Sequence, residues 1–137
     1  MNTFSLKIYT AERPFFEGEC ESLIVPTTQG LYGIMARHSD MVAALSDGEL
    51  QYRQKGATVF EHVAISPGIV AVTKNEVVVL TETAERASDI DYARAMRQYE
   101  SAKEDLKKEG DPISHHLSIA KLSRSLNRLK IRSKLGK

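Results

Sequence analysis

The sequence of 137 residues contains one cysteine and no tryptophan. A lone cysteine cannot close an internal disulfide, so the fold depends on an apolar core. A chain of this length buries roughly two thirds of the surface that its unfolded form exposes. No neighbour in the sequence would activate the thiol of Cys20, which we therefore expect to be a small strand residue in a reducing compartment.

Long apolar runs are also missing from the sequence. None approaches the ~20 residues that cross a bilayer, and the first residues lack the charged and apolar regions of a signal peptide. These absences predict a cytoplasmic protein, alone or on a membrane-bound partner.

Acidic side chains are absent from residues 113–137, which contain seven basic ones. The asymmetry extends over the whole chain: residues 1–89 hold 7 basic and 12 acidic side chains, a net charge of −5, and residues 90–137 hold 12 and 6, a net charge of +6. The basic end is expected to bind an anionic partner, which could be nucleic acid, lipid or an acidic protein face.

Alternating apolar residues dominate the sequence up to about Glu82, as in Phe4, Leu6 and Ile8. A period of two with turn residues every 8 to 12 positions is typical of strands in a sandwich or barrel. Residues 73–76 read as a tight hairpin turn, since Asn tolerates positive φ. The runs 69–72 and 77–80 are apolar at every position, which predicts burial on both faces of packed sheets.

A helical period begins after Ala87. Ser88 and Asp91 fit a capping box that opens a helix over about 89–109. The joint at 110–112, Gly-Asp-Pro, separates it from a second helix over about 113–134, so the two helices form an antiparallel hairpin. Their apolar stripes are thin, and we expect the hairpin to be conditionally stable and able to open.

Few residues are placed for catalysis or metal binding. Gly30–Gly33 resembles a phosphate-binding loop only superficially, because no helix follows it, and is read as a turn between strands. The histidines lie without ligand spacing, at His38, His62, His115 and His116. The sequence therefore predicts no catalytic residues and no metal site.

The arginines of the hairpin are more informative. Asp91 and Arg94 share one face of the first helix, and Arg124 and Arg128 share one face of the second. In a closed hairpin they could converge on a triphosphate, to which guanidinium groups form charge-assisted bonds. The alternative is that Asp91 only caps its helix and the arginines are solvated or contact a protein.

The order of several short motifs resembles the epsilon subunit of bacterial rotary F-type ATP synthases. The resemblance covers essentially the whole chain and is carried by Val25–His38, Leu45–Gly48, Ser66–Val72, Val79–Arg86 and Ile90–Ala95. It implies a ten-stranded β-sandwich over residues 1–86 that binds the gamma subunit and the c-ring. It further implies a regulatory two-helix hairpin over residues 87–137.

The same resemblance implies a function. The protein would be a non-catalytic central-stalk subunit that couples ion-driven rotation to ATP synthesis, peripheral to the cell membrane on its cytoplasmic side. Its hairpin would extend into the catalytic alpha/beta head and inhibit ATP hydrolysis. The family's pattern for regulatory ATP, with or without Mg, falls on Glu85, Asp91, Arg94, Arg124 and Arg128.

Departures from the family pattern concern both expected sites. A further arginine of the ATP pattern would fall on Ser101 and is missing, so we expect weak affinity. Contacts with the c-ring and gamma are expected at Leu31, Tyr32 and His38, although many relatives carry an acidic residue at Leu31. Arg37 stands where Gly is more usual.

A different reading keeps the basic second helix as a nucleic-acid-binding or other interaction module. Against this reading, residues 113–137 contain no Phe, Tyr or Trp to stack on bases, and the first part of the chain is acidic. An enzyme with a pocket in the sandwich is the remaining alternative. Capture of stalk and ring subunits, of polynucleotide, or of neither distinguishes the three.

Overall fold

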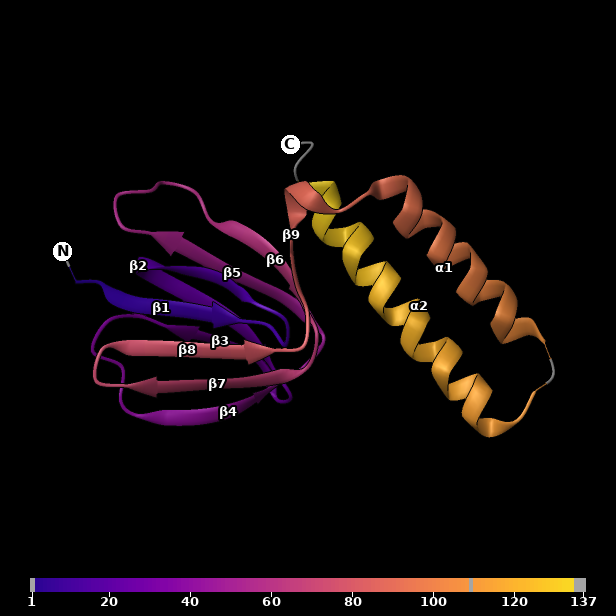
Figure 1. The fold of residues 1–137 in the computed structure, drawn as a ribbon, viewed down its shortest axis with the longest axis horizontal. Coiled ribbons are helices and arrows are strands. Elements are labelled where there is room, and N and C mark those ends of the chain that lie inside the picture. The colour runs from indigo at the N-terminus through magenta and orange to yellow at the C-terminus, as the bar shows by residue number, and fades with distance from the viewer. Residues whose placement is uncertain (1, 109, 135–137) are drawn as a thin grey trace. The chain divides into compact units, whose positions relative to one another are not determined.

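The computed structural model describes residues 2–108 and 110–134 (Figure 1). The chain divides into two compact units, with the boundary between Arg86 and Ala87. The described part of the first unit holds nine strands: β1 (Phe4–Tyr9), β2 (Pro14–Thr27), β3 (Gly30–Ile34), β4 (Met41–Leu45), β5 (Gly48–Gln54), β6 (Glu61–Ile65), β7 (Gly68–Thr73), β8 (Glu76–Thr81) and β9 (Ala84–Arg86).

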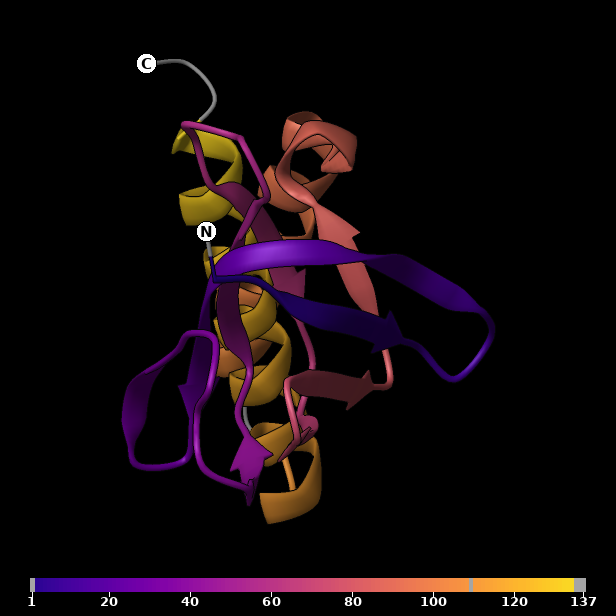
Figure 2. The same cartoon turned by 90° about the vertical axis from the view of Figure 1, so that its left-hand side faces the viewer.

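The sandwich is built around the long strand β2, whose 14 residues run without a break. Its first half pairs with β1 and its second half with β3 and β5; Figure 2 shows β1 and the first part of β2 side by side. Strand β1 also pairs in parallel with β8, which links the order β8-β7-β4 back to β2. The described residues therefore form nine strands, one fewer than the ten-stranded sandwich that the resemblance implied.

Alternation along the strands produces the core, as predicted. Phe4, Leu6 and Ile8 are buried while the residues between them are half-buried. The ring of Tyr52 lies 4.4 Å from that of Phe16, between centroids, in a tilted arrangement. Cys20 is fully buried, and this burial raises the pKa of its thiol to about 11, so the thiol is protonated and unreactive at neutral pH.

The β7–β8 hairpin confirms the predicted turn, with Lys74 and Asn75 at φ 27° and 66°. The prediction of burial on both faces was wrong. Val70 and Val79 face the core, but Ile69 and Leu80 are 42% and 44% exposed. These two lie opposite each other on the exposed side of the β7–β8 hairpin.

The second unit contains a short 3-10 helix, η1 (Ala87–Asp89), followed by α1 (Tyr92–Lys107) and α2 (Pro112–Ser133). Ser88 is not the N-cap, because η1 uses it in a tight turn in which the Ile90 N–H donates to Ala87. Asp91 caps α1 instead, accepting from the Arg94 N–H at 3.1 Å. The predicted helix end at Glu109 lies outside the described residues, and the described helix ends at Lys107.

Asp111 begins the second helix of the hairpin. Its carboxylate accepts from the Ser114 N–H at 2.7 Å, and this bond holds the pKa of Asp111 below its usual range. Pro112 occupies the first turn, where its missing N–H costs nothing. The Gly-Asp-Pro joint therefore ends one helix and starts the next, as predicted.

The two α-helices bury three small side chains, Ala95, Ala102 and Ser125, and one large one, Ile131 of α2. The larger apolar side chains of the predicted stripes remain partly exposed, including Met96 and Leu126. Small residues allow the helices to approach closely but remove little apolar area from water. Apart from Ile131, the apolar contacts of the α-helices therefore bury little area.

Candidate functional site

One row of side chains on α1 carries the residues of the expected nucleotide site. Asp91, Arg94 and Gln98 follow one another at spacings of three and four residues, which places them along one face. Ser101 continues this row and is exposed, so an arginine at that position would extend the row by one turn.

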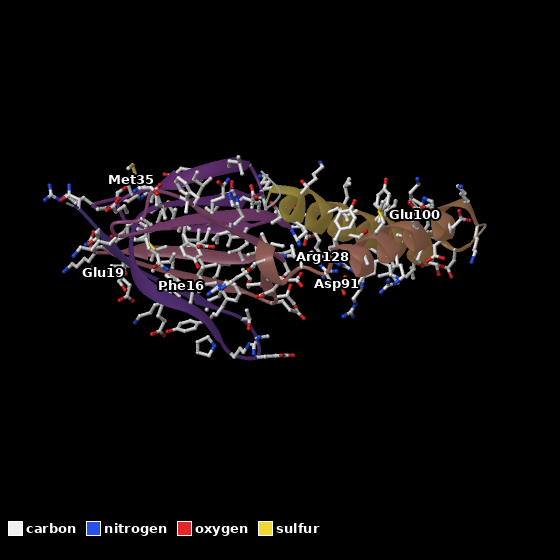
Figure 3. The ribbon with its side chains drawn as sticks, turned by 90° about the horizontal axis from the view of Figure 1, so that it is seen from above. Phe16, Glu19, Met35, Asp91, Glu100 and Arg128 are labelled. Atoms are coloured by element: carbon white, nitrogen blue, oxygen red, sulfur yellow. The ribbon has the colours of Figure 1, made fainter. Side chains whose placement is uncertain are left out.

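The other two expected arginines, Arg124 and Arg128, lie on one face of α2. Arg128 Nη1 donates to Gln98 Oε1 at 2.6 Å, and Arg132 Nε donates to the Ile90 carbonyl at 3.2 Å. These bonds fix the antiparallel register and bring Arg128 alongside the α1 row. Figure 3 shows Asp91 and Arg128 at the same end of the hairpin. Arg124 lies one turn from Arg128 on the same face.

The chemical capacity of this arrangement is a set of guanidinium groups on two adjacent helices. Arg94 and Arg124 are exposed and Arg128 is half-buried, so the two helices together can present several charge-assisted donors to a polyanion. Asp91 already serves as a helix cap through one carboxylate oxygen. Sequence reasoning missed Gln98 and Arg132, although the four-residue step from Arg94 to Gln98 was a signal for the first.

Glu85, the fifth expected ligand of ATP, belongs to the first unit. It is half-buried in β9 and lies opposite Ala64 of β6. The helical rows therefore account for four of the five expected residues.

The expected partner contacts lie on and after β3. Gly30–Gly33 is strand rather than turn, because the reversal occurs earlier, at residues 28–29. Leu31 is 71% exposed on this strand. The structure brings the other two residues together: the Tyr32 hydroxyl and His38 Nε2 are 2.8 Å apart, and the rings meet edge to face. His38 Nδ1 donates to the Ser39 carbonyl, so Nε2 is free to accept from Tyr32 in the neutral imidazole.

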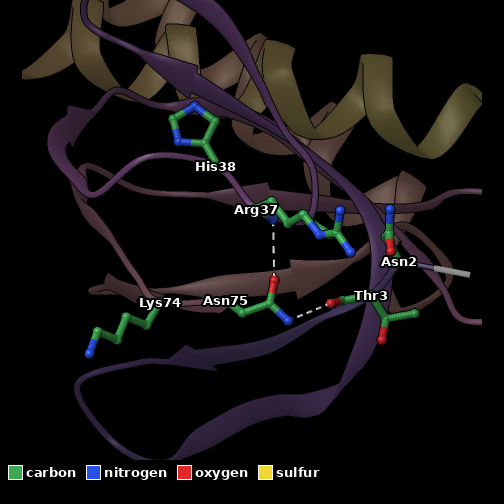
Figure 4. A pocket seen from close by; sticks show the side chains of 7 residues that line it. Asn2, Thr3, Arg37, His38, Lys74 and Asn75 are labelled. Atoms are coloured by element: carbon green, nitrogen blue, oxygen red, sulfur yellow. Dashed lines mark hydrogen bonds between the residues drawn. The ribbon is translucent and has the colours of Figure 1, made fainter.

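An open pocket adjoins His38 (Figure 4). The side-chain amide of Asn75 connects two segments that line the pocket. Its Oδ1 accepts from the Arg37 N–H at 3.3 Å, and its Nδ2 donates to the Thr3 carbonyl at 2.7 Å. Arg37 is in the left-handed region at φ 65°. The lining residues are Asn2, Thr3, Ala36, Arg37, His38, Lys74 and Asn75.

Residues 2–108 and 110–134 contain no group of three or more His, Cys, Asp or Glu side chains that could hold a metal ion. None of the helices in this part of the chain is both long and apolar enough to span a membrane.

Two family models match the chain in succession. Residues 3–87 match the beta-sandwich domain of the ATP synthase delta/epsilon chain, and residues 88–132 match its long alpha-helix domain. The chain belongs to the ATP synthase delta/epsilon family. The resemblance to the epsilon subunit is confirmed by curated relatives named ATP synthase epsilon chain.

Relatives of this family align along nearly their whole length. The protein from Ruminococcus albus is 38% identical over 135 residues, which are 98% of this chain and 99% of the relative. That from Syntrophomonas wolfei is 36% identical over 133 residues, covering 97% and 96%. Among solved structures, a chain of the Euglena gracilis mitochondrial ATP synthase, in an assembly described as OSCP/F1/c-ring, shares the fold. Its TM-score is 0.73 and its identity 19%, with 99% of this chain and 81% of that chain covered.

Proposed function

We propose that this chain is the non-catalytic epsilon subunit of the central stalk of an F-type ATP synthase, where it couples ion-driven rotation to ATP synthesis. The observation that carries the proposal is the match of both family domains, in order, over residues 3–132. The Tetrahymena thermophila structure with a TM-score of 0.60 is described as central stalk/c-ring, which supports the same place. The subunit would be peripheral to the cell membrane, on its cytoplasmic side.

The gamma subunit is the partner proposed for the outer face of β4, β7 and β8. Val42 is 72% exposed there. Ala44, two residues further along β4 and so on the same face, lies opposite Ile69 of β7, which lies opposite Leu80 of β8, so all four side chains share one face of the sheet. Exposed apolar clusters of this kind usually mark an interface. Leu31, Tyr32 and His38 are proposed to face the c-ring.

The hairpin is proposed to inhibit ATP hydrolysis when it opens. Its second helix presents exposed basic side chains, including Lys121 and Arg124, which would be attracted to acidic surface on the catalytic alpha/beta head. Deleting residues 88–137 should then raise ATP hydrolysis by the assembled complex and leave assembly intact. Unchanged hydrolysis would remove the inhibitory role.

Regulatory ATP, with or without Mg, is proposed to bind the closed hairpin at Asp91, Arg94, Arg124 and Arg128. A ligand that binds only the closed form at ~100 times Kd stabilises that form by roughly 2.7 kcal/mol. This is enough to reverse a marginal equilibrium, so ATP would hold the hairpin closed and relieve inhibition.

Isothermal titration of the full chain with ATP, with and without Mg, tests this site. Arg128→Ala should weaken binding by about 1.5 to 3 kcal/mol, as for a lost bond to a charged group. Lys130→Ala removes a charge from the same helix at an exposed position away from the Arg128 row and should bind as the wild type does. Ser101→Arg should tighten binding. No heat with either the wild type or Ser101→Arg at millimolar ATP would contradict a nucleotide site.

A further inference from the structure

Strained backbone marks the pocket beside His38. Among the described residues, the non-glycine residues with positive φ are Arg37, Lys74 and Asn75, and all three line this pocket. For Lys74 and Asn75 the conformation is the ordinary requirement of a tight β-hairpin. Arg37 is different, because residues 35–38 lie between strands and do not form such a hairpin.

The backbone of Arg37, which lies in a turn at residues 36–37, is hydrogen-bonded to a residue distant in the sequence. Its backbone N–H donates to Asn75 Oδ1, and the same amide group is anchored to Thr3. Glycine would adopt φ 65° without the steric cost that a side chain brings. A strained residue that the surroundings hold in place is a reason to look for a role of its side chain.

The guanidinium of Arg37 is available to a ligand. It extends toward Asn2 across the pocket, whereas the Lys74 ammonium points away (Figure 4). Lys7, Arg53 and Lys55 of the same unit each pair with a carboxylate. Among the described carboxylates none lies within 4.0 Å of the Arg37 guanidinium, and the seven lining residues include no acid. The nearby carboxylate of Asp40 accepts from the Lys74 backbone N–H instead.

Apolar side chains complete the surface. Leu31 and Met35, the latter 60% exposed, lie in the segment that leads to Arg37, and Tyr32 is held against His38 at the pocket wall. A charged donor beside exposed apolar residues fits a polypeptide that brings both an acidic and an apolar side chain. An anionic membrane fits less well, because its extended negative field would repel the acidic first unit as a whole. A single carboxylate interacts only with charges within about 10 Å, so it would be attracted to Arg37 without being repelled by distant acidic residues.

We propose that the pocket of Arg37, His38 and Asn75 receives a carboxylate side chain from an acidic loop of a partner polypeptide, with Arg37 as the specificity-determining donor. The proposal rests on the proposed function, since it places this loop on the c-ring that Leu31, Tyr32 and His38 are proposed to face. The strained backbone of Arg37 is then the energetic cost of placing a guanidinium at a position where glycine would adopt the same φ without steric conflict.

Arg37→Gly separates the two roles of this residue. The full-length chain is titrated against the detergent-purified c-ring of the source organism, and its thermal unfolding is measured in parallel. We expect Arg37→Gly to raise the melting temperature by several degrees while weakening ring binding at least tenfold. Arg37→Lys should stay within about threefold of the wild type. Arg13→Ala, which removes an exposed cation elsewhere in the unit, should leave binding unchanged.

The opposite outcomes are equally clear. Wild-type binding with no loss in Arg37→Gly would overturn the proposal and leave the ring-facing function standing. No binding by the wild type would overturn the ring-facing function and this proposal together. Arg37-dependent binding to phosphatidylglycerol vesicles in place of the ring would assign the pocket to lipid and also overturn it.

Discussion

The two units of the chain are stabilised in different ways. The sandwich buries large side chains completely, among them Leu23, Leu50 and Tyr52. The α-helices of the hairpin bury a single large side chain, Ile131, beside Ala95, Ala102 and Ser125, and rely also on caps and on bonds such as Arg128 to Gln98. Apolar area gives the first unit a robust core, whereas polar contacts between two thin stripes give the second a stability that a ligand or partner can change. The comparison identifies the sandwich as a platform and the hairpin as the element that responds.

Truncating one large core residue should have the largest effect. Leu50→Ala in the sandwich is expected to reduce the free energy of unfolding by about 2 to 5 kcal/mol, because Leu50 is fully buried. Leu126→Ala in the hairpin is the matched control, and since Leu126 is 37% exposed its cost should be about 1 kcal/mol or less. Urea unfolding of both variants measures the difference. Equal losses would contradict the contrast between the units.

Overpacking the hairpin should affect the helices alone. Ala102 is fully buried, and Ala102→Leu is expected to cost about 1 to 3 kcal/mol by forcing the helices apart. Amide resonances of α1 and α2 should shift or broaden while those of the sandwich stay in place. Loss of sandwich resonances would show that the two units fold as one.

Removing the hairpin should have a small effect on the sandwich. A fragment of residues 1–86 contains the nine described strands and the sandwich core that they form. Its thermal melt should therefore remain cooperative and nearly coincide with the main transition of the full chain. A fragment without a cooperative transition would make the helices part of the core.

Acidification should weaken the sandwich slightly through Glu21. A bond from the Gly56 N–H, with Arg53 as a second donor, holds the pKa of Glu21 below its ordinary value. Because the folded pKa is the lower one, this stabilisation is complete above the unfolded pKa and is lost as pH falls through the folded pKa. Glu21→Gln should flatten this part of the stability curve, measured by urea unfolding between pH 6 and about 3. An unchanged curve would show that Glu21 does not contribute to the pH dependence of stability.

Local patterns predicted much of the fold, and tertiary contacts decided the rest. The alternation of Phe4, Leu6 and Ile8, the turn at 73–76 and the Gly-Asp-Pro joint follow from rules of short range, and the structure confirms them. The cap is Asp91 and not Ser88, because residues 87–89 form a 3-10 helix and α1 begins only after it. The exposed side of β7 was missed because an apolar run cannot show whether a second layer or a partner covers it.

The candidate sites show the same division. Helical spacing placed Asp91, Arg94, Arg124 and Arg128 on two faces, but it could not show that Gln98 receives Arg128. The pocket beside His38 joins residues 2–3, 36–38 and 74–75. Segments so far apart in sequence meet through tertiary contacts such as the strand pairings of β1 with β8 and of β4 with β7, and the side-chain amide of Asn75.

Native-state hydrogen exchange of the full chain, with and without ATP, tests most directly whether the hairpin is the responsive unit. Without ATP, amides of α1 and α2 should exchange by local opening, far faster than those of β1, β2 and β8. ATP at ~100 times its Kd should slow exchange in the helices roughly 100-fold and leave the strands unchanged. Equal protection in both units without ATP, or helices whose exchange ATP does not alter, would show that the hairpin is not the responsive unit.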